Sequence, residues 1–261
     1  MLAEPVADPA DQRLADFRDL MQADHPDRRS VLIAEGANVV ERLARSPYRV
    51  RAVAGVASKL AALEPVLADL DCPVYLLDKW TLSDLVGFRV TRGVLASADR
   101  PAPADPERLI ASGRRFVVLE AINDFENLGA IFRNSAAFGV DGVLLDPRCA
   151  DPLYRRSVRV SMGNVFGVRF ASLPGWPDSL ALLRAAGVPL LALTPRPAGK
   201  SLQGFEPPDR WALMLGAEGP GLTEPALAAA DCWLRIPMAD GVDSLNVATA
   251  GAVALSQLAA L

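Results

Sequence analysis

Short apolar runs alternate with longer stretches of helical pattern along most of the chain. In the first half the apolar runs lie at 30–34, 50–54, 74–77 and 93–96, and the helical patterns lie at 36–43, 58–70 and 81–86. In the second half the apolar runs lie at 115–119, 142–145, 165–170, 189–193 and 211–215, and helical patterns lie at 130–138, 178–186 and from 223 onward. This alternation predicts an α/β fold, and unbroken apolar runs are typical of buried parallel strands.

The last stretch, residues 236–261, joins a strand end and a polar loop to a helix that is almost entirely apolar. Beyond Asn246, the side chains able to hydrogen-bond are Thr249, Ser256 and Gln257. We therefore expect this helix to be covered on nearly all sides, within its own domain or by a second subunit. Ser244 and Asn246 lie where the loop becomes the helix, so capping of the helix is their simplest interpretation.

A proline-rich segment at 97–106 separates the two halves of the pattern, because three prolines among small and acidic residues favour neither helix nor central strand. With 261 residues, of which 51% are hydrophobic, the chain can build two cores. The prediction is a flexible N-terminal arm over 1–28, a small α/β domain over 29–96, a linker over 97–112 and a second α/β domain over 113–261.

The few cysteine and histidine residues limit the chemistry. Cys72, Cys149 and Cys232 are far apart and odd in number, which favours neither a disulfide framework nor a zinc site and indicates a reducing, cytoplasmic setting. His25 is the only histidine, so histidine-based triads and His-rich metal sites are excluded. We expect no metal and no membrane insertion, since no signal sequence or long apolar span is present.

Two segments are basic although the net charge is −4. Residues 28–59 hold seven Lys or Arg against two acids, and residues 152–170 hold four Arg and no acid. The candidate RNA contacts in these segments are Arg42, Arg45, Arg155, Arg156 and Arg159, with the ring of Tyr154 available to stack on a base. Ordinary solvated helix surface remains the alternative interpretation.

Two polar loops in the second half also stand out. The first, 123–129, leads into the helix that carries Arg133, and the second, 216–222, has three glycines directly after an apolar strand with Glu218 as its one charge. The glycine order is G-x-x-G-x-G, whereas a dinucleotide fingerprint is G-x-G-x-x-G and follows a first strand. A nicotinamide-dependent oxidoreductase therefore has only this misordered pattern in its favour. The glycines more plausibly let the backbone approach a ligand closely.

These loops and the C-terminal stretch together resemble the SpoU branch (TrmH-like) of the SPOUT RNA methyltransferases. The three matching segments are 127–134 (NLGAIFRN), 213–222 (LMLGAEGPGL) and 236–248, which runs from Ile-Pro-Met to Ser-Leu-Asn-Val-Ala. Residues 30–96 more loosely resemble an L30e-like RNA-binding domain. Two departures are visible: Phe125-Glu126 stands where Pro-Gly is common, and Gly241 lies one position later than in some relatives.

The resemblance implies a methyl transfer from S-adenosylmethionine to a ribose 2'-hydroxyl of RNA. It also implies a C-terminal SPOUT domain whose parallel sheet is tied in a deep trefoil knot, and an active site at a homodimer interface. The catalytic residues that it nominates are Arg133, Asn127, Glu218, Ser244 and Asn246. The residues that it nominates for cofactor binding are Gly216, Ile236, Leu245, Leu215, Met238 and Ala248.

Arg133 is nominated as essential, but a guanidinium deprotonates only at about pH 12 or above and is a poor general base. We therefore expect Arg133 to grip the phosphate beside the target ribose, so that this phosphate or a water receives the proton. A surface salt bridge for Arg133 and a helix-capping role for Glu218 are the structural alternatives. Ribosomal RNA is the preferred substrate, with transfer RNA possible, and a non-catalytic ribosome-associated RNA-binding protein is the alternative of another class.

Overall fold

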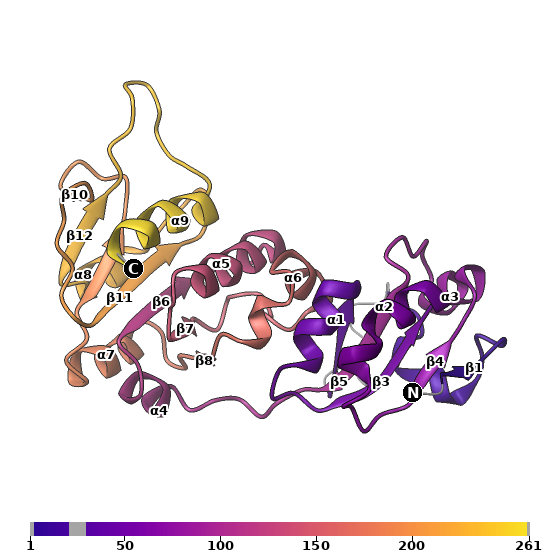
Figure 1. Ribbon diagram of the computed structural model, residues 1–261. Helices are drawn as coiled ribbons and strands as arrows, with labels where there is room; N and C mark the ends of the chain where they lie inside the picture. The colour runs from indigo at the N-terminus through magenta and orange to yellow at the C-terminus, as the bar shows by residue number, and fades with distance from the viewer. Residues whose placement is uncertain (1–2, 21–29, 260–261) are drawn as a thin grey trace. The chain divides into compact units, whose positions relative to one another are not determined.

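The computed structural model describes residues 3–20 and 30–259. The chain divides into two compact units (Figure 1). Unit 1 comprises Met1–Ala102 together with Leu153–Phe166, and unit 2 comprises Pro103–Pro152 together with Gly167–Leu261. Each unit is described by itself.

Unit 1 is built on a mixed sheet that has five strands within the described residues, in the order β1-β4-β3-β5-β2. The strands are β1 (Glu4–Pro5), β2 (Val31–Glu35), β3 (Val50–Gly55), β4 (Val74–Leu76) and β5 (Val94–Asp99). The helices are η1 (Gln12–Phe17), α1 (Ala37–Ala44), α2 (Ala57–Leu67) and α3 (Lys79–Val86). Strand β5 runs antiparallel to both β2 and β3, whereas β3–β4 and β1–β4 are parallel pairs.

The predicted flexible arm is, where described, part of unit 1. Its residues 4–5 form strand β1 beside β4, and the η1 side chains Leu14 and Phe17 are fully buried in the core of the unit. The prediction of a loose arm was wrong here because these apolar side chains, although they stand in an acidic and proline-containing segment, are spaced so that they face the core together. Residues 21–28 of the predicted arm, including His25, lie outside the described residues.

The predicted linker is also shorter than expected. Residues 97–99 complete β5, and helix α4 (Pro106–Ala111) begins at the last proline of the segment. The Asp105 carboxylate caps that helix by accepting the amide N–H of Glu107 at 2.9 Å. A proline in the first turn is compatible with a helix because its missing N–H would be unpaired there anyway.

A segment from the second half of the sequence belongs to unit 1. Helix α6 (Arg155–Val160) packs against β2, and η3 (Asn164–Phe166) packs against α1. The Phe166 ring lies 5.4 Å from the ring of Tyr48 in an edge-on contact. The strand predicted at 165–170 was therefore wrong: its first residues form η3, and β8 (Phe170–Ser172) begins only at Phe170.

Unit 2 is built on a sheet that has seven strands within the described residues, in the order β10-β12-β9-β11-β6-β7-β8, and every pair is parallel. The strands not yet given are β6 (Arg115–Glu120), β7 (Gly142–Leu145), β9 (Leu190–Leu193), β10 (Lys200–Ser201), β11 (Trp211–Gly216) and β12 (Cys232–Arg235). The helices besides α4 are α5 (Phe125–Ala137), η4 (Asp178–Leu180), α7 (Ala181–Ala185), α8 (Glu224–Ala229) and α9 (Val247–Leu258). The predicted α/β fold with a parallel sheet is confirmed.

Helix α9 returns from β12 to the middle of the sheet. It packs against α5 and β11, and the Asn134 side chain of α5 donates to the backbone oxygen of Ala248 at 2.9 Å. One side of α9 is buried, but Ala250, Ala252 and Val253 are half-buried, so unit 2 alone does not cover the helix all round. Over the described ranges, no helix is both long and apolar enough to cross a bilayer.

Candidate functional site

A cavity of about 540 Å³ opens where three neighbouring strands of unit 2 end. Strand β9 lies between β12 and β11 in the sheet, so the loops that follow these three parallel strands emerge side by side. The lining residues come from Leu193–Arg196, Leu215–Leu222, Ile236, Met238 and Ser244–Val247, with Ala250 of α9. Such a crevice at the carboxyl ends of parallel strands is the usual ligand position in α/β folds.

The glycine-rich loop of the cavity is folded tightly on itself. A bridge joins Ala217 to Gly221, whose amide donates to the Ala217 carbonyl at 3.0 Å. A Cβ atom on Gly216 would lie 2.4 Å from the carbonyl carbon of Gly221 and from the amide nitrogen of Leu222. No side chain fits at Gly216, so the loop presents backbone rather than side chains to this part of the cavity.

A polar triad, Asn127, Glu218 and Asn246, joins the three predicted motifs. The Asn246 amide nitrogen Nδ2 donates to the Asn127 Oδ1 at 2.8 Å and to the Glu218 Oε1 at 2.5 Å. The Asn246 Oδ1 accepts the amide N–H groups of Ala248 and Thr249 at the start of α9. The capping interpretation of Asn246 is therefore confirmed, and its amide nitrogen remains engaged with the other two motifs, because the two interactions use different atoms of the same side chain.

Most of the other nominated residues lie at the same cavity. Ser244, Leu215, Gly216, Ile236, Met238 and Leu245 all line it. Ala248 does not: it is buried, and its carbonyl accepts the hydrogen bond from α5. Leu245 is 39% exposed. The segment between β12 and α9 extends away from the sheet (Figure 1).

Arg133 stands apart from this group. It is exposed on α5 and does not line the cavity. By helix geometry it lies about 9 Å along the axis from Asn127 and about 120° around it. Within the described parts of the chain no hydrogen bond or ion pair engages its side chain, so the surface salt bridge considered above is not formed.

The loop after β9 is part of the cavity but was missed from the sequence. It contributes Leu193, Thr194, Pro195 and Arg196. Its position follows from strand order alone, which the sequence did not disclose. The Arg196 guanidinium pairs with Glu224 and lies over the Trp233 ring at 5.6 Å, and this pairing lowers the pKa of the Glu224 carboxyl.

Two further features of the described residues bear on metal binding and on thiol chemistry. Those residues contain no group of three or more His, Cys, Asp or Glu side chains arranged to hold a metal ion. Burial raises the pKa of the Cys149 thiol to about 12, so this cysteine is almost fully protonated at neutral pH.

The five arginines predicted to contact RNA all belong to unit 1. Arg155 is engaged inside the unit: it pairs with the buried carboxylate of Glu35 at 2.9 Å and lies over the Phe88 ring at 4.6 Å. The Arg42 guanidinium donates to the carbonyl of Met162, which brings α1 beside the turn that follows α6.

The other three predicted RNA contacts reach the surface of unit 1. Arg45 and Arg156 are exposed and Arg159 is half-buried. Arg45 pairs with Glu41 across one turn of α1. We call Arg42, Arg45, Arg156 and Arg159 the basic region.

Comparison with known proteins agrees with this geometry. Residues 114–256 match the model of the SpoU rRNA Methylase family. An uncharacterized tRNA/rRNA methyltransferase of Mycobacterium tuberculosis is 44% identical over 96% of this chain and 90% of its own length. A Bacillus subtilis 23S rRNA guanosine 2'-O-methyltransferase is 26% identical over 95% of this chain and 96% of its own length.

A solved structure has the same fold over nearly the whole chain. The AdoMet-bound rRNA methyltransferase from Sinorhizobium meliloti superposes with a TM-score of 0.80 at 25% identity, covering 98% of this chain and 97% of that one. The residues that match the family model, 114–256, contain the triad, the three motifs and all the residues that line the cavity. The chain is a member of the SpoU family of RNA methyltransferases.

Proposed function

We propose that this chain transfers a methyl group from S-adenosylmethionine to a ribose 2'-hydroxyl of RNA, with ribosomal RNA as the preferred substrate. The observation that carries the proposal is the bond of Asn246 to both Glu218 and Asn127, because it joins one polar side chain from each of the three motifs beside one cavity. The ribose position and the ribosomal substrate also draw support from the Bacillus subtilis relative, whose name states both.

The cavity suits the proposed cofactor. Its volume of about 540 Å³ lies within the range of about 300–1,000 Å³ that is usual for small-molecule and cofactor sites. Leu215, Ile236 and Met238 provide apolar surface, and the backbone around Gly216 can approach a ligand directly. When bound, S-adenosylmethionine supplies a methyl group already activated by its sulfonium.

The protein's own residues then have two tasks. The first is to hold the ribose oxygen in line with the methyl group, and the triad with Ser244 provides hydrogen-bonding groups for this at the cavity mouth. The second is to guide the hydroxyl proton away as the new C–O bond forms. Arg133 binds the phosphate beside the target ribose, and a phosphate oxygen or a water accepts the proton, since the guanidinium itself cannot.

We also infer that two copies of the chain form the working enzyme. The support is that Arg133 lies outside the cavity of its own chain, while α9 keeps half-buried apolar positions and the loop before it exposes Val242 and Leu245. Mixing Arg133→Ala with Asn246→Ala tests this. If each site draws Arg133 from one copy and Asn246 from the other, random dimers restore about a quarter of the sites. No recovery after exchange of subunits would contradict the inference.

The path of the chain end favours the deep trefoil knot. The segment from Ile236 to Val247 leaves β12, borders the same cavity as the loop after β9, and leads into α9 against β11. We propose that this tail passes through the loop that connects β9 to β11. An experimental structure in which the tail runs outside that loop would refute the knot.

Two experiments test the core of the proposal. Calorimetry of the purified chain with S-adenosylmethionine should give saturable uptake, and mapping of 2'-O-methyl positions should reveal one ribosomal site lost from cells without the gene. A methyl site lost from transfer RNA would keep the chemistry and change the substrate. Uptake of no cofactor would instead indicate a non-catalytic RNA-binding protein.

A further inference from the structure

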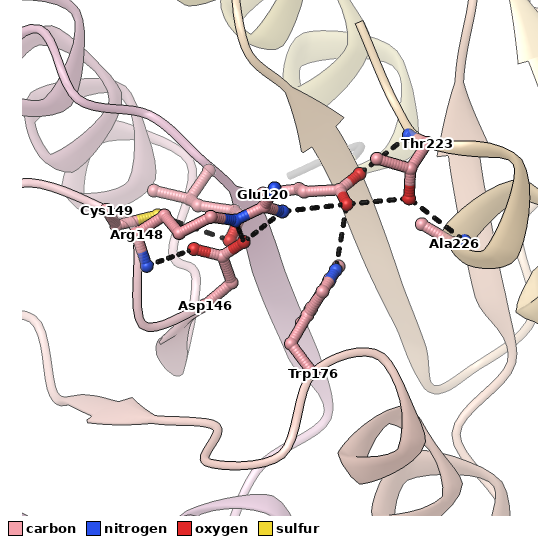
Figure 2. Close-up of polar contacts among 8 residues, drawn as sticks. Glu120, Asp146, Arg148, Cys149, Trp176, Thr223 and Ala226 are labelled. Atoms are coloured by element: carbon pink, nitrogen blue, oxygen red, sulfur yellow. Dashed lines mark hydrogen bonds and ion pairs between the residues drawn. The ribbon is translucent and has the colours of Figure 1, made fainter.

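A buried carboxylate outside the cavity holds the base of the glycine-rich loop. Glu120 is the last residue of β6 and only 1% exposed. Its Oε1 accepts the Trp176 indole N–H and the Thr223 hydroxyl, both at 2.8 Å, and the Arg148 guanidinium at 3.1 Å. Its Oε2 accepts the backbone N–H of Thr223 at 2.9 Å. Figure 2 shows these side chains converging on Glu120 from separate segments of unit 2.

The partners of Glu120 are themselves fixed. Asp146 is 2% exposed and binds the Arg148 side chain through Nε at 2.9 Å and Nη2 at 2.7 Å. The Thr223 hydroxyl also serves as the acceptor that caps α8. The carboxylate of Glu120 therefore has several donors and little freedom, as a buried charge requires.

The register of the sheet makes this network significant for the cavity. Gly216, where the glycine-rich loop begins, is the pairing partner of Glu120 on the neighbouring strand β11. Thr223, where the loop ends, is bound by the Glu120 side chain. A single residue thus holds both ends of the loop that carries Glu218 and lines the cavity.

Glu120 also precedes the first motif. Ala121, the next residue, has a φ of 55°, a left-handed conformation that is unfavourable for a residue with a side chain. The chain turns there toward Asn127 and helix α5. Such strain persists only where surrounding contacts fix the backbone, and here the bonds to Glu120 lie on one side of Ala121 and the bond from the Ala150 N–H to the Ile122 carbonyl lies on the other.

We propose that Glu120 is a positioning residue for the cofactor loop: through Thr223 it sets the distance between β6 and the segment Gly216–Leu222, and so the shape of the cofactor half of the cavity. The proposal rests on the proposed use of S-adenosylmethionine. It assigns Glu120 no contact with the cofactor or RNA.

The main test compares Glu120→Gln with Asp141→Asn in the full chain. Glutamine keeps the shape of the Glu120 side chain, but one of its two polar groups becomes an NH2 that faces the donors of Thr223 or Trp176. Asp141 is a matched control at the other end of β6, where its carboxylate accepts the backbone N–H groups of Arg114 and Arg115 at 2.7 and 2.9 Å. We expect Glu120→Gln to raise the Kd and KM for S-adenosylmethionine about tenfold or more, with a smaller change in kcat.

The same two variants distinguish a positioning role of Glu120 from a general effect on the stability of the fold. If Asp141→Asn loses as much thermal stability as Glu120→Gln, its Kd for S-adenosylmethionine should still remain within about twofold of that of the unaltered chain. Hydrogen exchange should quicken at the amides of 217–223 in Glu120→Gln only. An unchanged Kd in folded Glu120→Gln, or an equal rise in Asp141→Asn, would overturn the inference.

A second pair of variants decides the matter if Glu120→Gln does not fold. Thr223→Val removes the hydroxyl donor, whereas Thr223→Ser keeps it. We expect weaker cofactor binding in the valine variant and nearly normal binding in the serine variant, and equal affinities would overturn the inference. If the unaltered chain takes up no S-adenosylmethionine, the proposed function falls and this inference with it. Normal uptake with no effect of these variants removes the inference alone.

Discussion

In unit 2 the polar side chains of the triad are hydrogen-bonded to one another and come from three separate segments. In the described part of unit 1, the arginines of the basic region form no such shared network among themselves. Among the described residues, the Asn246 side chain makes five hydrogen bonds: it donates to two acceptors and accepts from three donors. Arg45, by contrast, has a single exposed partner, Glu41, and such surface pairs contribute at most about 1 kcal/mol. The cavity should therefore respond steeply to single changes, and the basic region gradually and with a dependence on salt.

The largest effect is expected from Asn246→Asp. Aspartate can still cap α9 through one oxygen, but its other oxygen would face the Glu218 carboxylate, where the amide now lies at 2.5 Å. Repulsion between the two carboxylates should open the triad and lower kcat/KM for methyl transfer about 100-fold or more. The measurement is methyl transfer to RNA under single turnover.

Asn246→Ser is the matched control for this change. Serine also caps a helix well, so it separates loss of the cap from loss of the triad. We expect α9 to keep its stability in Asn246→Ser while activity still falls, though less than with aspartate. Full activity in both variants would show that the triad is only structural.

The second effect concerns Arg155, the predicted RNA contact whose guanidinium is paired with Glu35 inside unit 1. Arg155→Met should leave the buried carboxylate of Glu35 without its partner and lower the free energy of unfolding by about 2–3 kcal/mol. RNA affinity, measured below the unfolding temperature, should barely change. The double variant Arg155→Met with Glu35→Met should recover stability, because both charges are then gone. Lost RNA affinity in a stable Arg155→Met would return this residue to the RNA-binding set.

Much of unit 2 was predictable from sequence for a physical reason. Strands β6, β7 and β11 are covered on both faces, so they read as unbroken apolar runs, and their predicted bounds agree with the structure within one residue. The glycine-rich loop and the C-terminal loop that line the cavity were also singled out from the sequence, since each follows an apolar strand directly. Both signals are local.

The features that the sequence did not predict depend on contacts between residues that are far apart in the chain. The loop at 193–196 reaches the cavity only because β9 lies between β12 and β11. Glu120 looks in sequence like the polar end of an apolar strand, and Arg155 looks like its neighbour Arg156. Only the packing reveals that Glu120 organises a loop and that Arg155 is bound to Glu35.

The third prediction sharpens the role of Arg133. Arg133→Lys keeps the charge but loses the planar fork that binds a phosphate through two parallel hydrogen bonds. We expect kcat/KM for RNA to fall about tenfold while the Kd for S-adenosylmethionine stays constant, because Arg133 does not line the cofactor cavity. Arg169→Lys, at another exposed arginine of unit 2, is the control. Full turnover by Arg133→Lys would mean that a point charge suffices.

The smallest effects are expected in the basic region of unit 1. Arg45→Gln and Arg159→Gln should each weaken RNA binding by about three- to fivefold and lower the slope of log K against log salt by about 1. Arg108→Gln in unit 2, an arginine that is 90% exposed, is the control and should change neither quantity. Because these substitutions leave the cavity intact, kcat at saturating RNA should remain normal. A fall in kcat with an unchanged salt slope would contradict this prediction. It would mean that these arginines affect catalysis at the cavity and do not bind the phosphate backbone of the RNA.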